Sequence, residues 1–160
     1  MAATADPRVA FQKVLSTLYD RPIQISDAPK FEPTFSKPAA LAVYVTEGDA
    51  VTGLLVCSMP AAAYLGASLS LLPKPVAEDC IKKGTLDDNL LENFREVANI
   101  CASLFADQIA ARAHLQKVVP KCTAAPADYK ALMASPRRVD LGITVPNYGD
   151  GIVSIRLPKV

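Results

Sequence analysis

Four polar side chains are spaced so that they follow one line along a predicted helix: Glu92, Glu96, Asn99 and Ser103. At about 100° per residue, their spacing confines them to an arc of about 60°. Exposed carboxylates beside an amide can dock onto a positively charged partner and hold a water molecule. The same pattern is typical of an ordinary solvated face, which every amphipathic helix has. Residue type and spacing alone leave both interpretations open.

The composition limits the chemistry open to the chain. With 17 basic and 16 acidic residues, the net charge of +1 argues against a nucleic-acid partner, for which a basic surface is the usual sign. His114 is the only histidine, so it cannot supply the paired imidazoles of a zinc hydrolase, and a Ser-His-Asp relay would have to use it alone. We therefore expect carboxylates, amides or hydroxyls to carry any chemistry.

The cysteines are interpreted as reduced core thiols. None of the four belongs to a CxxC pair, and Cys57 and Cys101 lie in strongly apolar segments. Their spacing is not that of metal ligands, so we expect no metal site and no cofactor of the protein's own. The N-terminus lacks the features of a signal peptide, and no apolar stretch approaches the roughly 20 residues that span a bilayer. We expect a cytoplasmic protein with no membrane partner.

The order of predicted elements indicates an α+β fold within a single domain, 1–160. Helices are predicted after Asp6-Pro7 and after Ser58-Met59-Pro60, with a short helical turn that ends at Gly84. Strands are predicted near 23–25, 40–47, 51–59, 137–145 and 151–157, and the apolar run 51–59 favours a central position in the sheet. We expect a two-layer domain in which helices cover an antiparallel sheet, with a loop rich in proline and alanine before 137–145.

The longest helix is predicted from about Leu86 to about Arg112. Thr85 and Asp88 have the spacing of a variant capping box at its start. The apolar residues that repeat at helical spacing are expected to form its core face: Leu90, Phe94, Val97, Cys101 and Leu104.

The segment LENFREVANICASLF resembles the signature helix of the CheC/CheX/FliY family of response-regulator phosphatases. In that family a short acid or serine is followed four residues later by Glu and three after that by Asn, which Glu96 and Asn99 match. The resemblance covers nearly the whole chain and is closest to CheX, from the N-terminal helix through MPAAAYLGASL and Pro120 to the closing hairpin. Two positions depart from it: Glu92 stands where Asp or Ser is usual, and Ser103 where glycine is frequent.

The resemblance implies a chemotaxis or other two-component phosphatase that hydrolyses the aspartyl phosphate of a CheY-like receiver domain. It assigns catalysis to Glu96 and Asn99, with Asn99 positioning the attacking water and Glu96 docking onto a lysine of the receiver. Glu92 and Ser103 are expected to contact the partner. The receiver would supply the phosphoaspartate and its Mg²⁺, so the protein itself would need no metal.

A second interpretation of the resemblance is a catalytically silent CheX-like module that binds a signalling partner or mediates dimerisation. The longer acid at Glu92 favours this interpretation, whereas the intact Glu96 and Asn99 favour the enzyme. A homodimer is a further possibility, in which the last strand, within GIVSIRLPKV (151–160), could pair across the interface because its apolar residues alternate.

Two further features allow other interpretations. His114 or Ser103 as a nucleophilic centre is less favoured, because His114 has no obvious oriented partner in the sequence. The adjacent Arg137 and Arg138 are expected to be exposed charges that discourage edge pairing of a strand, with an acidic receiver surface as the alternative contact.

Overall fold

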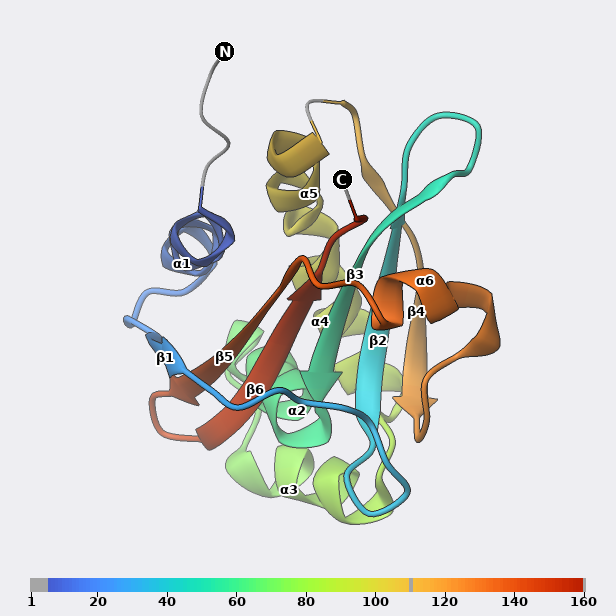
Figure 1. Ribbon diagram of the computed structural model, residues 1–160. Helices are drawn as coiled ribbons and strands as arrows, with labels where there is room; N and C mark the ends of the chain where they lie inside the picture. The colour runs from blue at the N-terminus through green and yellow to red at the C-terminus, as the bar shows by residue number, and fades with distance from the viewer. Residues whose placement is uncertain (1–5, 110, 160) are drawn as a thin grey trace.

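The fold is built on one antiparallel sheet of six strands, drawn in Figure 1. The computed structural model describes residues 6–109 and 111–159. The strands within these ranges are β1 Gln24–Asp27, β2 Ala39–Val45, β3 Val51–Ser58, β4 His114–Cys122, β5 Arg138–Val145 and β6 Gly149–Arg156. Their spatial order is β1-β5-β6-β3-β2-β4, and every neighbouring pair is antiparallel. The α+β expectation is confirmed, as is the central position of the run 51–59, which forms β3.

Helices cover one face of this sheet. They are α1 Pro7–Leu18, α2 Met59–Leu69, α3 Lys74–Lys83, α4 Asp88–Ile100 and α5 Ala102–Ile109. In Figure 1, α2, α4 and α5 lie behind the sheet, whereas α1 stands beside its upper left corner and packs against α5 and β5. The larger of two cores fills the space between the helices and the sheet.

The opposite face of the sheet has a much thinner cover, drawn in front of the strands in Figure 1. It consists of the segment 28–38, the 3₁₀ turn η1 Ala127–Tyr129 and the short helix α6 Lys130–Met133. These segments bury Phe31, Leu132 and Met133 against β2 and β3. Every residue of β2 is therefore buried, which explains its continuous apolar sequence. The loop expected before β5 thus contains two short helical turns.

Local capping residues place the starts of α1 and α2 and the end of α3 where the sequence predicts them. The Asp6 carboxylate accepts a hydrogen bond from the Arg8 backbone N–H at 2.9 Å and begins α1. The Ser58 hydroxyl oxygen accepts from the backbone N–H of Ala61 at 3.3 Å and from that of Ile152 at 2.9 Å, which joins the start of α2 to β6. Gly84, at φ 72°, ends α3 in the left-handed conformation.

The predicted dimer contact through the last strand is wrong. β6 lies between β5 and β3, and β5 pairs with it along its whole length, from Arg138 opposite Arg156 to Val145 opposite Gly149. β3 pairs with the other side of β6 over Val153–Arg156, so a second copy would have to displace a neighbouring strand to pair with this part of β6. In the described sheet, the edge strands are β1 and β4.

Candidate functional site

α4 begins at a cap that differs from the predicted one. The Asp87 carboxylate accepts a hydrogen bond from the Leu90 backbone N–H at 3.0 Å, so Asp87 is the N-cap residue. The capping box expected for Thr85 and Asp88 is therefore wrong, because the helix starts two residues later than that motif requires. Asp88 lies in the first turn, where the helix dipole favours a negative charge.

One face of α4 is anchored in the core, as the sequence predicts. Leu90, Phe94 and Val97 are fully buried, and so are Cys101 and Leu104 beyond the helix end. Asn93 adds a polar anchor, since its amide donates to the Gly66 carbonyl oxygen at 2.9 Å and to the Ser70 hydroxyl at 2.6 Å, both at the end of α2. These contacts fix the rotation of α4 about its axis and therefore the direction in which its opposite face points.

Glu92, Glu96 and Asn99 are exposed on the opposite face of α4. None of their side chains makes a hydrogen bond or an ion pair with another residue in the described parts of the chain. Ile100, directly after Asn99, is 40% exposed, which is unusual for a large apolar side chain in this fold. The helix thus presents two carboxylates, an amide and an apolar side chain to solvent or to a partner.

The predicted helix 86–112 is two helices, α4 and α5, which meet at Cys101. Two carbonyls at this junction are taken by hydroxyl groups: Tyr44 donates to the Ala98 carbonyl oxygen at 2.6 Å, and Ser103 donates to that of Ile100 at 3.2 Å. A continuous α-helix would use these carbonyls for the backbone N–H groups four residues later. The Leu104 N–H bonds instead to the Cys101 carbonyl oxygen, which tightens the chain locally.

The break separates Ser103 from the other three residues of the predicted stripe. Ser103 lies in the first turn of α5 and, with Ile100 and Asp107, lines a groove of about 430 Å³ against α1. The other wall of the groove includes Val9, which is 61% exposed. Glu92, Glu96 and Asn99 share α4, and Ser103 lies at the adjoining groove.

The cysteine interpretation agrees with the structure: all four thiols are free and buried. Burial raises the pKa of the Cys101 thiol to about 12 and that of Cys57 well above its ordinary value, so neither forms a thiolate near neutral pH. Among residues 6–109 and 111–159, no three His, Cys, Asp or Glu side chains are grouped as metal ligands would be. His114 is exposed at the start of β4.

A buried charge network on the thinly covered face was missed at the sequence level. Arg156 is fully buried, and its guanidinium donates to the carbonyl oxygens of Phe31 at 2.6 Å and Met133 at 2.9 Å. Arg138 is 9% exposed at its side chain and pairs with Asp140 and with Glu32. The expectation of an exposed Arg138 at a strand start is wrong, because the segment 28–38 folds over it. No signal in the sequence indicated this network. Arg156 lies in β6, and this strand is predicted only from its alternating apolar residues.

Comparisons of the sequence with protein-family models and with curated proteins give no match. Comparison of the structure with solved structures gives several. CheX of the Borrelia burgdorferi CheX-CheY-BeF3-Mg²⁺ complex shares 14% identity at a TM-score of 0.56, over 99% of this chain and 100% of that chain. Chemotaxis protein CheX from Vibrio vulnificus shares 10% identity at a TM-score of 0.54, over 98% of this chain and 99% of that chain. A chain of the FliM-SpeE complex from H. pylori shares 12% identity at a TM-score of 0.60, over 94% of this chain and 80% of that chain.

These likenesses identify the fold as the one shared by a class of solved structures that includes the CheX proteins and FliM. The chain has the fold of the CheC/CheX/FliY family, which the FliM middle domain shares, so the resemblance seen in the sequence is confirmed at the level of fold. The structure also reveals no helix, within the residues it describes, with the length and apolarity needed to cross a membrane.

Proposed function

We propose that the protein is a phosphatase for the aspartyl phosphate of a CheY-like receiver domain. The observation that carries this proposal is the exposure of Glu96 and Asn99 and their lack of hydrogen-bond or ion-pair partners within the described residues. Both are exposed, without partners in the described chain, and one helical turn apart on a helix whose other face is fixed in the core. The fold they belong to is also that of a CheX solved with CheY and BeF3.

Asn99 would act on the attacking water. Its amide oxygen accepts a hydrogen bond from water, its NH₂ group donates to a phosphoryl oxygen, and it stays neutral at every working pH. The water oxygen forms a bond to phosphorus while the bond from phosphorus to the aspartyl oxygen breaks, which yields a free carboxylate and inorganic phosphate. An acyl phosphate already has a good leaving group, so positioning of the water is the main requirement.

Glu96 would hold the receiver in register. Its carboxylate can pair with the ammonium group of a receiver lysine near the phosphoaspartate, which aligns Asn99 with the phosphorus atom. The receiver would bring its own Mg²⁺. Glu92, one turn earlier on α4, would meet the receiver surface beside this pair, and Ser103 would meet it at the groove between α5 and α1.

A catalytically silent binding module is the second candidate. The FliM middle domain has this fold, FliM complexes with SpeE and with FliG are among the similar structures, and Glu92 is longer than the usual acid. The direct test is the decay of ³²P-labelled phosphoaspartate in receivers from the same genome, with and without the protein. Faster decay for at least one receiver supports the enzyme. Tight binding of a BeF3-treated receiver with unchanged decay for all of them supports the silent module.

A further inference from the structure

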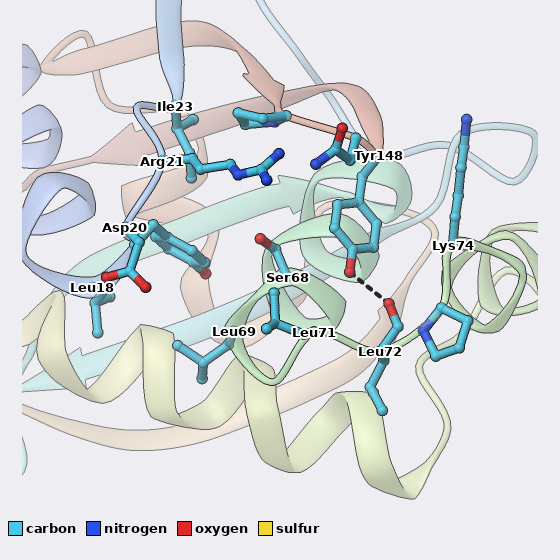
Figure 2. Close-up of a pocket in the computed structure, with 14 residues that line it drawn as sticks. Leu18, Asp20, Arg21, Ile23, Ser68, Leu69, Leu71, Leu72, Lys74 and Tyr148 are labelled. Atoms are coloured by element: carbon cyan, nitrogen blue, oxygen red, sulfur yellow. Dashed lines mark hydrogen bonds between the residues drawn. The ribbon is translucent and has the colours of Figure 1, made fainter.

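A cleft on another side of the molecule is lined by three segments that are far apart in the sequence. Its volume is about 580 Å³, and none of its lining residues belongs to α4 or α5. The walls come from 18–23 after α1, from 68–74 at the end of α2, and from 146–148 between β5 and β6 (Figure 2). This volume is in the range of small-molecule sites.

The walls of the cleft are joined by hydrogen bonds. The Tyr148 hydroxyl donates to the Leu72 carbonyl oxygen at 2.5 Å, the interaction drawn dashed in Figure 2. On the other side, the buried Tyr19 hydroxyl donates to the Leu65 carbonyl oxygen at 2.7 Å. Both bonds tie a separate segment to the end of α2. A ligand would therefore meet a cleft that is already formed, which lowers the entropic cost of binding.

Donor groups without partners face this cleft. The side chains of Arg21, Ser68, Lys74 and Asn147 line it and make no hydrogen bond or ion pair with another described residue. Figure 2 shows the Arg21 guanidinium extending toward Tyr148, with the Ser68 hydroxyl pointing from below toward the same space. The Asp20 carboxylate also belongs to the lining, but it points away from Tyr148 in this view.

Four carbonyl groups near the end of α2 already have hydrogen-bond donors. Carbonyls in the last turn carry the negative end of the helix dipole, and these four do not face the cleft unpaired. Leu65 and Gly66 accept from the side chains of Tyr19 and Asn93. Ala67 and Ser68 accept from the backbone N–H groups of Leu72 and Leu71, at 2.9 and 3.3 Å.

Unusual backbone conformations occur at the same cleft, and the one at Leu71 is strained because leucine, unlike asparagine, rarely adopts a positive φ. The described chain has three non-glycine residues with positive φ, and two of them, Leu71 at 55° and Asn147 at 70°, line this cleft. Leu71 is also 83% exposed, so burial of its side chain does not offset the strain. Strained residues of this kind cluster at ligand sites. Leu71 and the Tyr148 ring give the cleft an apolar part beside its donors.

We propose that this cleft binds a small molecule that carries a phosphate or carboxylate group on an apolar body. The anionic group would take hydrogen bonds from Arg21, Ser68 and Asn147, and the body would pack against Leu71 and Tyr148. The site is separate from α4 and does not depend on the proposed phosphatase activity.

The test is titration of the full-length ¹⁵N-labelled protein with phenyl phosphate, inorganic phosphate and phenol, followed by NMR. Phenyl phosphate should shift amides of 18–23, 68–74 and 146–148 saturably and bind more tightly than either of the other two probes. Arg21→Gln should lower the affinity for phenyl phosphate roughly tenfold or more, because a charge-assisted hydrogen bond is lost. The matched control is Arg112→Gln, which removes an exposed arginine outside the cleft.

A second variant separates the two parts of the site. In Leu71→Gly, the glycine adopts the positive φ without strain. This variant should bind phenyl phosphate more weakly and inorganic phosphate with unchanged affinity. The proposal is overturned if phenyl phosphate shows no saturable shifts at tens of millimolar, or if the shifts lie outside the cleft. It is also overturned if Arg21→Gln and Arg112→Gln have the same effect, or if inorganic phosphate binds as tightly as phenyl phosphate.

Discussion

The hydroxyl of Tyr44, on β2, donates a hydrogen bond of 2.6 Å to the carbonyl oxygen of Ala98, on α4. Both groups are buried, and the Tyr44 ring stacks on Phe105 of α5 with centroids 4.1 Å apart. One side chain of the sheet therefore contacts the helices on both sides of the break at Cys101. Asn99, the residue proposed to position water, comes directly after the carbonyl that Tyr44 holds.

Tyr44→Phe should lower the free energy of unfolding by about 1–3 kcal/mol, because it leaves the buried Ala98 carbonyl oxygen without its partner while the ring remains. Urea unfolding at equilibrium measures this as a lower midpoint with an unchanged slope. The matched control is Tyr64→Phe, since the Tyr64 hydroxyl bonds to no residue in the described ranges. Equal effects of the two variants would show that the Tyr44 hydroxyl has no special role.

Gly53→Ala should destabilise the protein through Phe105. A Cβ atom at Gly53 would lie 2.1 Å from Cδ1 of the Phe105 ring, and Phe105 is fully buried, so it has little room to move. Overpacking of this kind costs about 1–3 kcal/mol.

The double variant Gly53→Ala with Phe105→Leu tests that contact, again by urea unfolding. A smaller side chain at 105 should make the cost of Gly53→Ala smaller than it is alone, so the two effects should not add. Additive effects would mean that the Gly53 substitution acts through something other than the Phe105 ring.

Asp140 should make stability depend on pH in the acid range. Burial favours its neutral form, but hydrogen bonds from Arg138, from the Phe31 N–H and from Ser154 outweigh burial and lower its pKa below the ordinary value. The folded protein therefore binds this proton less tightly than the unfolded chain does. The resulting stability is fully present above the unfolded pKa, about 4, and is lost as pH falls through the lower folded pKa.

Asp140→Asn should remove this part of the acid dependence and cost about 3 kcal/mol at pH 7, because it leaves Arg138 with one carboxylate fewer in a buried site. Unfolding free energies measured from pH 2 to pH 7 provide the check. Asp27→Asn is the control, since the Asp27 side chain is 87% exposed. An Asp140→Asn curve parallel to that of the wild type would contradict the linkage.

Asn99→Ala should slow dephosphorylation of a responsive receiver about 100-fold with little change in receiver affinity, because a positioning group acts mainly on the reacting water. Glu96→Ala should lower both the dephosphorylation rate and the receiver affinity, and the affinity should fall roughly tenfold because a docking ion pair is lost. Rates come from single-turnover decay of the labelled receiver, and affinities from binding of its BeF3-treated form.

Asn89→Ala is the control for the amide, since Asn89 is exposed on the same helix ten residues earlier, about 15 Å along its axis. It should leave both quantities unchanged. If Asn99→Ala retains the full rate, Asn99 is not the residue that positions water.

Local signals in the sequence determined most of the elements and one face of α4. The helix starts at Asp6 and Ser58 are predictable because a capping side chain and a following proline lie within three residues of each other. The helical spacing of Leu90, Phe94 and Val97 predicts a buried face even when the surface it packs against is not known. The line of Glu92, Glu96 and Asn99 follows from that same period. These features were predictable because a helix repeats its geometry every turn.

Tertiary structure decided where that helix stops and what else the fold buries. At the break near Cys101, Tyr44 donates to the Ala98 carbonyl oxygen from 54 residues away, and the segment 28–38 buries Arg138 and Arg156 from more than 100 residues away. The cleft of Arg21, Leu71 and Tyr148 likewise exists only where three distant segments meet. Such contacts produce no repeating pattern in the sequence, because each joins one pair of distant positions. They could not be predicted without the complete arrangement of the strands.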